Sequence, residues 1–309
     1  MGGRRGDPYA ECMRRQLGAG LLLCAVVLTA MPLTPAAGAG AGAGPTDPFE
    51  GRGTWVSVFM DTWDRPGRHV RRMHRKGVQT IFLQTSSTQV PSDGRVFRRD
   101  RVHRFIEAAH ARDMNVVAWY LPPLRNVDQE YDRAMAAIRL RTPNGHRFDG
   151  FGLDIEPSHG TPPVPLRNDK LLRLSRKINR SVADSYPLGA IIPSPIGMRR
   201  AEWYWPDFPY QELGRIYDVV VPMSYSSYRV SGAAATYDYT WKNVGILRRQ
   251  VGPDVRIHMI GGEAGALNGR ESRALVRAVN DRGVPGASLW HYGSTTFEDW
   301  QALRELSPP

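Results

Sequence analysis

Short apolar runs recur along the chain, and a longer amphipathic stretch follows each of them. The runs that predict β-strands cover residues 55–59, 80–84, 115–120, 148–157, 189–193, 219–225, 256–260 and 287–291. Between them, apolar residues recur with helical spacing, for example over residues 101–111, 169–182 and 271–281. Strands that alternate with helices indicate right-handed crossovers and a parallel sheet. Eight such units in roughly 250 residues predict a single-domain α/β protein, a closed (β/α)8 TIM barrel.

The first 44 residues differ in character from the rest of the chain. Arg14 and Arg15 precede an apolar run at residues 21–28, and small residues follow it. This order is typical of a cleaved signal peptide, and the apolar run is too short to span a membrane as a stable helix. We therefore predict a signal peptide and flexible leader over residues 1–44 and the barrel over residues 45–309. The mature protein is expected to be secreted and extracellular, with no stable membrane span.

Cysteine content and charge narrow the possible chemistry. Both cysteines, Cys12 and Cys24, lie in the predicted leader, so the mature chain has no disulfide and no thiol nucleophile. The whole chain carries a formal charge of +11, and the leader holds four Arg and two acidic residues, which leaves +9 for the barrel. The Arg residues are spread over predicted helices, which favours a basic surface that contacts anionic cell-wall material or simply faces solvent. No nucleic-acid-binding motif accompanies them, so nucleic acid is not an expected partner.

Two histidines on or at the end of predicted strands, His258 and His291, are candidate metal ligands. Neither belongs to a close cluster of ligand residues in the sequence. An isolated His on a barrel strand is more often packed and hydrogen-bonded than bound to a metal. We therefore expect no metal and no cofactor.

The fourth strand carries the most informative side chains. Three apolar residues face one side of it: Phe151, Leu153 and Ile155. Asp154 and Glu156 share the opposite side with Gly152, at the C-terminal end of the strand. A buried charge without a partner costs several kcal/mol, so packing alone does not explain this pair. Paired carboxylates suit acid–base work on a glycosidic bond; the alternative is a salt-bridged pair at the rim of the barrel.

Polar and aromatic residues also gather at the C-terminal ends of the other predicted strands and in the loops that follow, a region we call the barrel mouth. Active sites of this fold lie there. Seven residues are expected to bind substrate: Trp63, Trp119, Tyr120, Met223, Trp203, Trp205 and Trp290. Aromatic faces with a polar edge suit stacking on sugar rings and hydrogen bonding to their hydroxyls. The pattern favours a polysaccharide as the partner.

The sequence from Asp149 to Glu156 resembles the fourth-strand signature of family 18 glycoside hydrolases, D-x-x-D-x-D-x-E. Three of its four acidic positions match: Asp149, Asp154 and Glu156. The sequence Met223-Ser224-Tyr225 resembles the M-x-Y of strand six in that family, and Trp290 resembles its strand-eight Trp.

This resemblance implies specific roles for the matched residues in a secreted glycoside hydrolase that acts on a β-linked polysaccharide or cell-wall glycan. Glu156 would be the general acid, and Asp154 would orient the acetamido group of the substrate. Tyr225 would hydrogen-bond the reacting carbonyl, and Trp290 would form the floor beneath the scissile sugar. Asp149 is assigned to the substrate-binding residues. The N-acetyl oxygen of the substrate would then be the nucleophile, and no cofactor would be needed.

The chain departs from this family at several positions, and two other interpretations stay open. Gly152 occupies the position of the second Asp, Ser226 replaces the Asp or Asn after the Tyr, and strand three lacks the S-x-G-G sequence. Glu263, after the seventh strand, permits a retaining mechanism with Glu156, for which the two carboxyl groups must lie about 5–5.5 Å apart. The third interpretation is a catalytically inactive barrel that binds carbohydrate.

Overall fold

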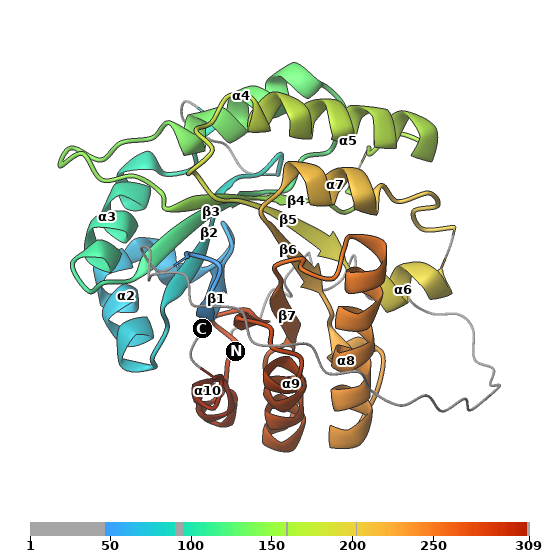
Figure 1. Ribbon diagram of the computed structural model, residues 1–309. Helices are drawn as coiled ribbons and strands as arrows, with labels where there is room; N and C mark the ends of the chain where they lie inside the picture. The colour runs from blue at the N-terminus through green and yellow to red at the C-terminus, as the bar shows by residue number, and fades with distance from the viewer. Residues whose placement is uncertain (1–46, 90–94, 159, 202, 308–309) are drawn as a thin grey trace, which may run out of the picture. The chain divides into compact units, whose positions relative to one another are not determined.

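The computed structural model describes residues 47–89, 95–158, 160–201 and 203–307, so the predicted leader lies outside the described residues. Eight parallel strands pair in chain order and close into a barrel, with β8 beside β1 (Figure 1). The strands are β1 (Gly51–Val56), β2 (Thr80–Ser86), β3 (Asn115–Tyr120), β4 (Gly150–Asp154), β5 (Leu188–Pro193), β6 (Val219–Met223), β7 (His258–Glu263) and β8 (Gly286–Trp290). The predicted (β/α)8 barrel is confirmed.

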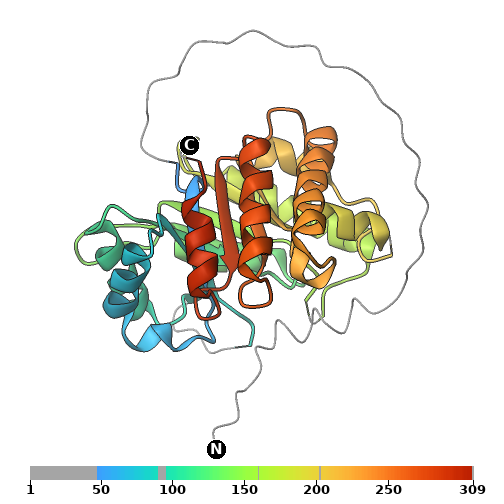
Figure 2. The same ribbon diagram turned by 90° about the horizontal axis from the view of Figure 1, so that it is seen from below.

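Helices follow the strands and cover the outside of the barrel (Figure 1). They are α2 (Pro66–Arg75), α3 (Arg99–His110), α4 (Val127–Ile138), α5 (Val164–Asn179), α6 (Pro195–Arg200), α7 (Tyr210–Ile216), α8 (Ala233–Gln250), α9 (Gly269–Asp281) and α10 (Phe297–Arg304), with short 3-10 helices η1 (Asp61–Asp64) and η3 (Ser226–Tyr228). In Figure 2, α8, α9 and α10, coloured orange to red, lie side by side. Across the described ranges, no helix combines the length and apolar character needed to cross a membrane.

Several strand ends differ from the sequence-based prediction, and the C-terminal ends of β6 and β7 are two that lie at the barrel mouth. The sequence pattern extends the sixth strand to residue 225, but β6 ends at Met223 because Tyr225 takes a left-handed backbone conformation, with φ of 40°. The pattern ends the seventh strand at residue 260, but β7 continues to Glu263 beyond an irregularity in its pairing with β8. Tyr225 is therefore a loop residue, whereas Glu263 is the last residue of a strand.

The strands separate two apolar layers because successive side chains point to opposite faces. Along β2, Ile81 and Leu83 belong to the core between the barrel and its helices. The intervening Phe82 points into the barrel, where its ring stacks on Trp55 with 4.3 Å between ring centroids. Trp119 meets Trp55 edge-on at 5.8 Å. The barrel interior is thus filled by aromatic rings below its mouth.

A hydrogen-bonded chain closes the lower part of the interior around His258. Its Nδ1 lies 2.7 Å from the carbonyl oxygen of Phe49, and its Nε2 lies 2.9 Å from the hydroxyl of Ser288. The indole Nε1 of Trp55 donates to the same hydroxyl at 2.8 Å. Burial lowers the pKa of His258 to about 4, so the imidazole is neutral at pH 7. Both ring nitrogens of His258 are hydrogen-bonded inside the barrel, as expected for an isolated barrel histidine.

Gly286, the first residue of β8, is expected to tolerate no side chain. A Cβ there would lie 2.2 Å from the carbonyl oxygen of Phe49 and 2.4 Å from Nδ1 of His258, which already hydrogen-bond each other. Gly286→Ala should therefore lower the free energy of unfolding by about 1–3 kcal/mol, measured by urea denaturation. Gly67→Ala on α2 is the control, because the nearest atom to its added Cβ is 3.8 Å away. Equal urea midpoints for Gly286→Ala and the unmodified protein would contradict this packing.

Candidate active site

The fourth strand delivers two carboxylic acids to the barrel mouth. β4 ends at Asp154, and Glu156 follows two residues later on the same face. Phe151 and Leu153, on the opposite face, pack in the core beneath the helices. Asp154 is only 6% exposed, and Glu156 is partly exposed. The alternation read from the sequence thus places both acids where the fold builds its active sites.

Burial disfavours the ionisation of both acids, and the charge of Glu156 adds to this effect at Asp154. Burial raises the pKa of Asp154 well above its ordinary value, and the nearby charge of Glu156 raises it further. Burial also raises the pKa of Glu156 to about 7. Among the described residues, Oδ1 of Asp154 is buried without a hydrogen-bond partner. The pair therefore keeps a bound proton near neutral pH, and a general acid must be protonated in this way.

Tyr225 joins this pair from the loop after β6. Its side chain is buried, and its pKa is raised first by burial and then by the charges of Glu156 and Asp154. The phenol is therefore protonated and able to donate a hydrogen bond beside the two acids. The structure brings together Glu156, Asp154 and Tyr225, which the sequence assigned to catalysis.

Glu263 approaches the same site from β7. The hydroxyl of Tyr228 donates a hydrogen bond to its Oε2, and its backbone N–H donates to the hydroxyl of Ser227 at 3.2 Å. The charge of Glu263 contributes to the raised pKa of Tyr225, so the two side chains are within electrostatic range. The 5–5.5 Å separation between the carboxyl groups of Glu156 and Glu263 stays a prediction.

Trp290, the last residue of β8, lies above the aromatic interior. Its ring meets Trp119 edge-on at 5.8 Å and Trp55 at 6.3 Å, and the side chain is 9% exposed. Met223 is also buried, at the end of β6, where it pairs in register with Ile260. Trp119 is only 1% exposed, so it supports Trp290 and has no surface for a ligand in this structure.

An isoleucine occupies the space that an acidic side chain at position 152 would need. A Cβ on Gly152 would lie 2.8 Å from Cδ1 of Ile191, a residue of β5 that pairs in register with Asp154. Asp154 therefore has an apolar neighbour where the family 18 signature would supply a second carboxylate. Ile191 was not identified from the sequence, although a glycine at that signature position implies that a neighbouring strand fills the space.

Two further predicted substrate-binding residues do not face the mouth. Asp149 precedes β4 at its N-terminal end, the opposite end of the barrel, where it accepts the backbone N–H of Val116 at 2.7 Å. It also pairs with His110 at 2.9 Å, and this hydrogen bond raises the pKa of His110. Tyr120 points toward the helices, and its hydroxyl donates to Glu130 at 2.7 Å. The structure corrects both assignments, because Asp149 lies at the opposite end of the barrel and Tyr120 faces the helices.

Two predicted substrate-binding tryptophans are core residues. Trp63 is 1% exposed; its Nε1 donates to the carbonyl of Ser57 at 2.7 Å, and its ring packs edge-on against Phe97 and Phe105. Trp205 is 2% exposed and its Nε1 donates to Asn168 at 2.6 Å. Neither indole has a surface that a sugar could stack on.

Trp203 differs from these core tryptophans because it is 71% exposed in the loop between α6 and α7. The adjacent carbonyl of Tyr204 accepts a hydrogen bond from Arg167, near the start of α5. This contact ties the loop to the side of the barrel on which β4 ends. Trp203 thus remains a candidate for stacking on a sugar.

Glu156→Gln is expected to stabilise the protein in alkaline but not in acidic solution. Its pKa in the folded protein, about 7, exceeds the ordinary value of 4.5, so the folded protein holds this proton more tightly than the unfolded chain. Stability is therefore lost as pH rises from about 4.5 to 7. Glutamine cannot ionise, so the gain should be near zero at about pH 4 and on the order of 1–3 kcal/mol at about pH 8. Urea denaturation at both pH values measures this gain, and a pH-independent difference would contradict the raised pKa of Glu156.

No family model matches the sequence, and no curated protein matches it. Solved structures do share its fold. The Bacillus cereus spore cortex-lytic enzyme SleL superposes with a TM-score of 0.60 and 10% identity, over 83% of this chain and 74% of that one. A chitinase from Chromobacterium violaceum gives a TM-score of 0.58 and 12% identity, over 83% and 98% of the two chains.

A third similar structure is a glycoside hydrolase family 18 N-acetylglucosaminidase from Paenibacillus barengoltzii. Its TM-score is 0.57 at 13% identity, over 84% of this chain and 100% of that one. At such low identities the likeness establishes the fold. The chain therefore has the barrel found in chitinases and related proteins.

Proposed function

We propose that this protein is a glycoside hydrolase that cleaves a β-linked polysaccharide or cell-wall glycan, with Glu156 as its general acid. The observation that carries the proposal is the placement of buried Asp154 and partly exposed Glu156 together at the C-terminal end of β4, beside the phenol of Tyr225. Buried acids with strongly shifted proton affinity gather at catalytic sites more often than at structural ones. The fold shared with chitinases supports the same class of reaction.

The proposed reaction starts from protonated Glu156. Its carboxyl group transfers the proton to the glycosidic oxygen while the bond between that oxygen and the anomeric carbon breaks. In the first of the two routes described below, Tyr225 donates a hydrogen bond to the attacking N-acetyl oxygen and helps to hold it beside the anomeric carbon. Asp154 offers its unpartnered Oδ1 to a polar group of the substrate, and Trp290 packs beneath the sugar ring.

Two groups can act as the nucleophile in this proposal. In the first route it is the N-acetyl oxygen of the substrate, which Asp154 and Tyr225 would orient. In the second it is Glu263, which the hydroxyl of Tyr228 orients at the end of β7. A carboxyl separation of about 5–5.5 Å in a crystal structure would favour the second route, and one beyond about 10 Å would eliminate it. Turnover of glycans without N-acetyl groups would also favour Glu263.

The pH dependence of turnover tests the proposed function. Chitin, peptidoglycan fragments, β-glucans and β-galactans are the substrates to screen. For the glycan that is hydrolysed, kcat/KM should fall as pH rises above about 7, because Glu156 then loses the proton that it must donate. A rate that stays constant to about pH 9 would contradict this role. Binding without any turnover would instead identify an inactive carbohydrate-binding barrel.

Export belongs to the same proposal because a wall glycan lies outside the cell. The order of basic, apolar and small residues in the first 44 positions supports a cleaved signal peptide. Sequencing the N-terminus of the protein from the culture medium tests this. A mature form that begins at Met1 or Met13 would contradict it.

A further inference from the structure

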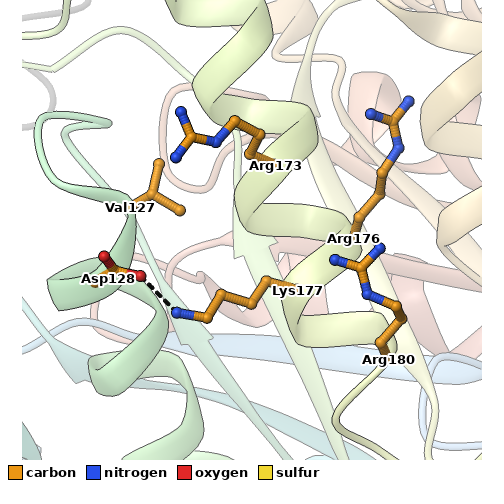
Figure 3. A pocket seen from close by; sticks show the side chains of 6 residues that line it. All are labelled: Val127, Asp128, Arg173, Arg176, Lys177 and Arg180. Carbon is orange, nitrogen blue, oxygen red and sulfur yellow. Dashed lines mark hydrogen bonds and ion pairs between the residues drawn. The ribbon is translucent and has the colours of Figure 1, made fainter.

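Basic side chains line one face of the second half of α5, at the far end of this helix from the loop that follows Glu156. They are Arg173, Arg176, Lys177 and the capping residue Arg180. Together with Val127 and Asp128 at the start of α4 they line a cleft of about 460 Å³ (Figure 3). Asp128 is the only acidic residue among those that line the cleft. The lining of the cleft therefore carries an excess of positive charge.

The contacts within the cleft fix one cation and leave others available. Nζ of Lys177 lies 2.5 Å from Asp128 and 4.2 Å from the ring centre of Tyr131, so its position is set by two neighbours. Arg173 forms an exposed ion pair at 3.6 Å with Asp169, one turn earlier on α5. Within the described part of the chain, neither Arg176 nor Arg180 forms an ion pair, and both are exposed. These two guanidinium groups carry the uncompensated charge.

The spacing of the cations indicates an extended ligand. They occupy positions i, i+3, i+4 and i+7 of one helix, which places them along about 10 Å of its axis. Figure 3 shows the side chains spread along the helix instead of converging on one point. A single phosphate ion would contact only part of this row. A linear polymer with regularly spaced charges would contact all of it.

The side chains that line the cleft favour one class of charged polymer. Three of the four cations are guanidinium groups, which bind the paired oxygens of a phosphate with two parallel hydrogen bonds. No aromatic residue is among those that line the cleft, so it has no platform on which nucleobases could stack. A phosphodiester in the backbone of a chain keeps its charge on the chain axis, where the cations along the cleft can reach it.

We propose that the α4–α5 cleft binds a linear, non-aromatic polymer that carries phosphodiester groups in its backbone. Such binding would hold the protein on an anionic matrix without involving Glu156 or the barrel mouth. The proposal is independent of the hydrolase activity proposed above.

Binding to immobilised poly(glycerol phosphate), measured at several NaCl concentrations, tests this proposal. The double variant Arg176→Gln/Arg180→Gln should bind about tenfold more weakly than the unmodified protein at low salt. The slope of log Kd against log salt concentration should fall by about 1–2, because two phosphate contacts are lost. The control Arg71→Gln/Arg72→Gln removes the same charge from exposed positions of α2 and should bind like the unmodified protein. Equal thermal unfolding of all three proteins confirms that each is folded.

Three results would overturn the proposal. The first is an equal loss of binding in the α2 control, which would show that net charge alone causes the loss. The second is equally tight binding of polyglutamate, which would remove the preference for phosphodiesters. The third is tighter binding of single-stranded DNA, which would make the cleft a nucleic-acid site.

Discussion

Glu156→Gln is expected to lower kcat for an unactivated β-glycan by about 10²–10⁴-fold, with little change in glycan binding. Glutamine keeps the shape and the hydrogen-bonding reach of the side chain but has no proton to deliver to the leaving oxygen. In the unmodified protein this proton stays on the side chain near neutral pH, because burial raises the pKa of Glu156 to about 7. Initial rates measure the loss, and a pull-down on insoluble glycan measures the retained binding.

The matched control is Glu298→Gln, which makes the same chemical change at an exposed position in the first turn of α10. It should leave both the rate and the binding unchanged. Unchanged hydrolysis in Glu156→Gln would show that another group is the acid. Loss of binding in this variant would instead assign Glu156 to substrate recognition.

Trp290→Ala is expected to lower the free energy of unfolding by about 3–5 kcal/mol, as for other large aromatic side chains removed from a core. The indole is 9% exposed and contacts the rings of Trp119 and Trp55, so its removal leaves a cavity at the top of the barrel interior. Urea denaturation measures the change.

Trp203→Ala provides the comparison for this variant. It removes the same side chain from a position that is 71% exposed, so its effect on unfolding should stay within about 0.5 kcal/mol. The same variant tests stacking, because a weaker affinity for glycan without a change in stability would place Trp203 on the substrate path. Equal destabilisation by both substitutions would contradict the placement of Trp290 in the interior.

The order of elements was predictable from the sequence because each apolar run of the barrel is short and is followed by an amphipathic helix. The third strand was predicted with its observed bounds, residues 115–120. The ends of β6 and β7 were not, because they depend on the left-handed conformation of Tyr225 and on the irregular pairing before Glu263. Neither feature has a signature in the hydrophobic pattern.

The two-residue repeat of a strand predicted some site residues and could have excluded others. It placed Asp154 and Glu156 on one face, as the structure does. The same repeat puts Trp119 and Tyr120 on opposite faces, so both could not line the mouth. Asp149 is five residues before Asp154, which places it near the other end of an extended strand. Asp149 matched the signature by residue type, but its place before the start of β4 puts it away from the mouth.

Residues in loops were harder to place because only tertiary packing decides where they lie. Trp63 and Trp205 follow strands in the sequence, yet each indole N–H finds a partner inside the core. Trp203, two residues from Trp205, stays exposed. The filling of the space beside Gly152 by Ile191 likewise depends on the register between β4 and β5, which one sequence does not reveal.

The role of Glu156 as the general acid is tested most directly by the leaving group. The measurement compares kcat/KM of Glu156→Gln and the unmodified protein on the hydrolysed glycan and on an aryl glycoside of the same sugar whose leaving group departs without protonation. If Glu156 is the acid, the variant should lose about 10²–10⁴-fold on the glycan but retain most of its rate of bond cleavage on the aryl glycoside. An equal loss on both substrates would contradict this account.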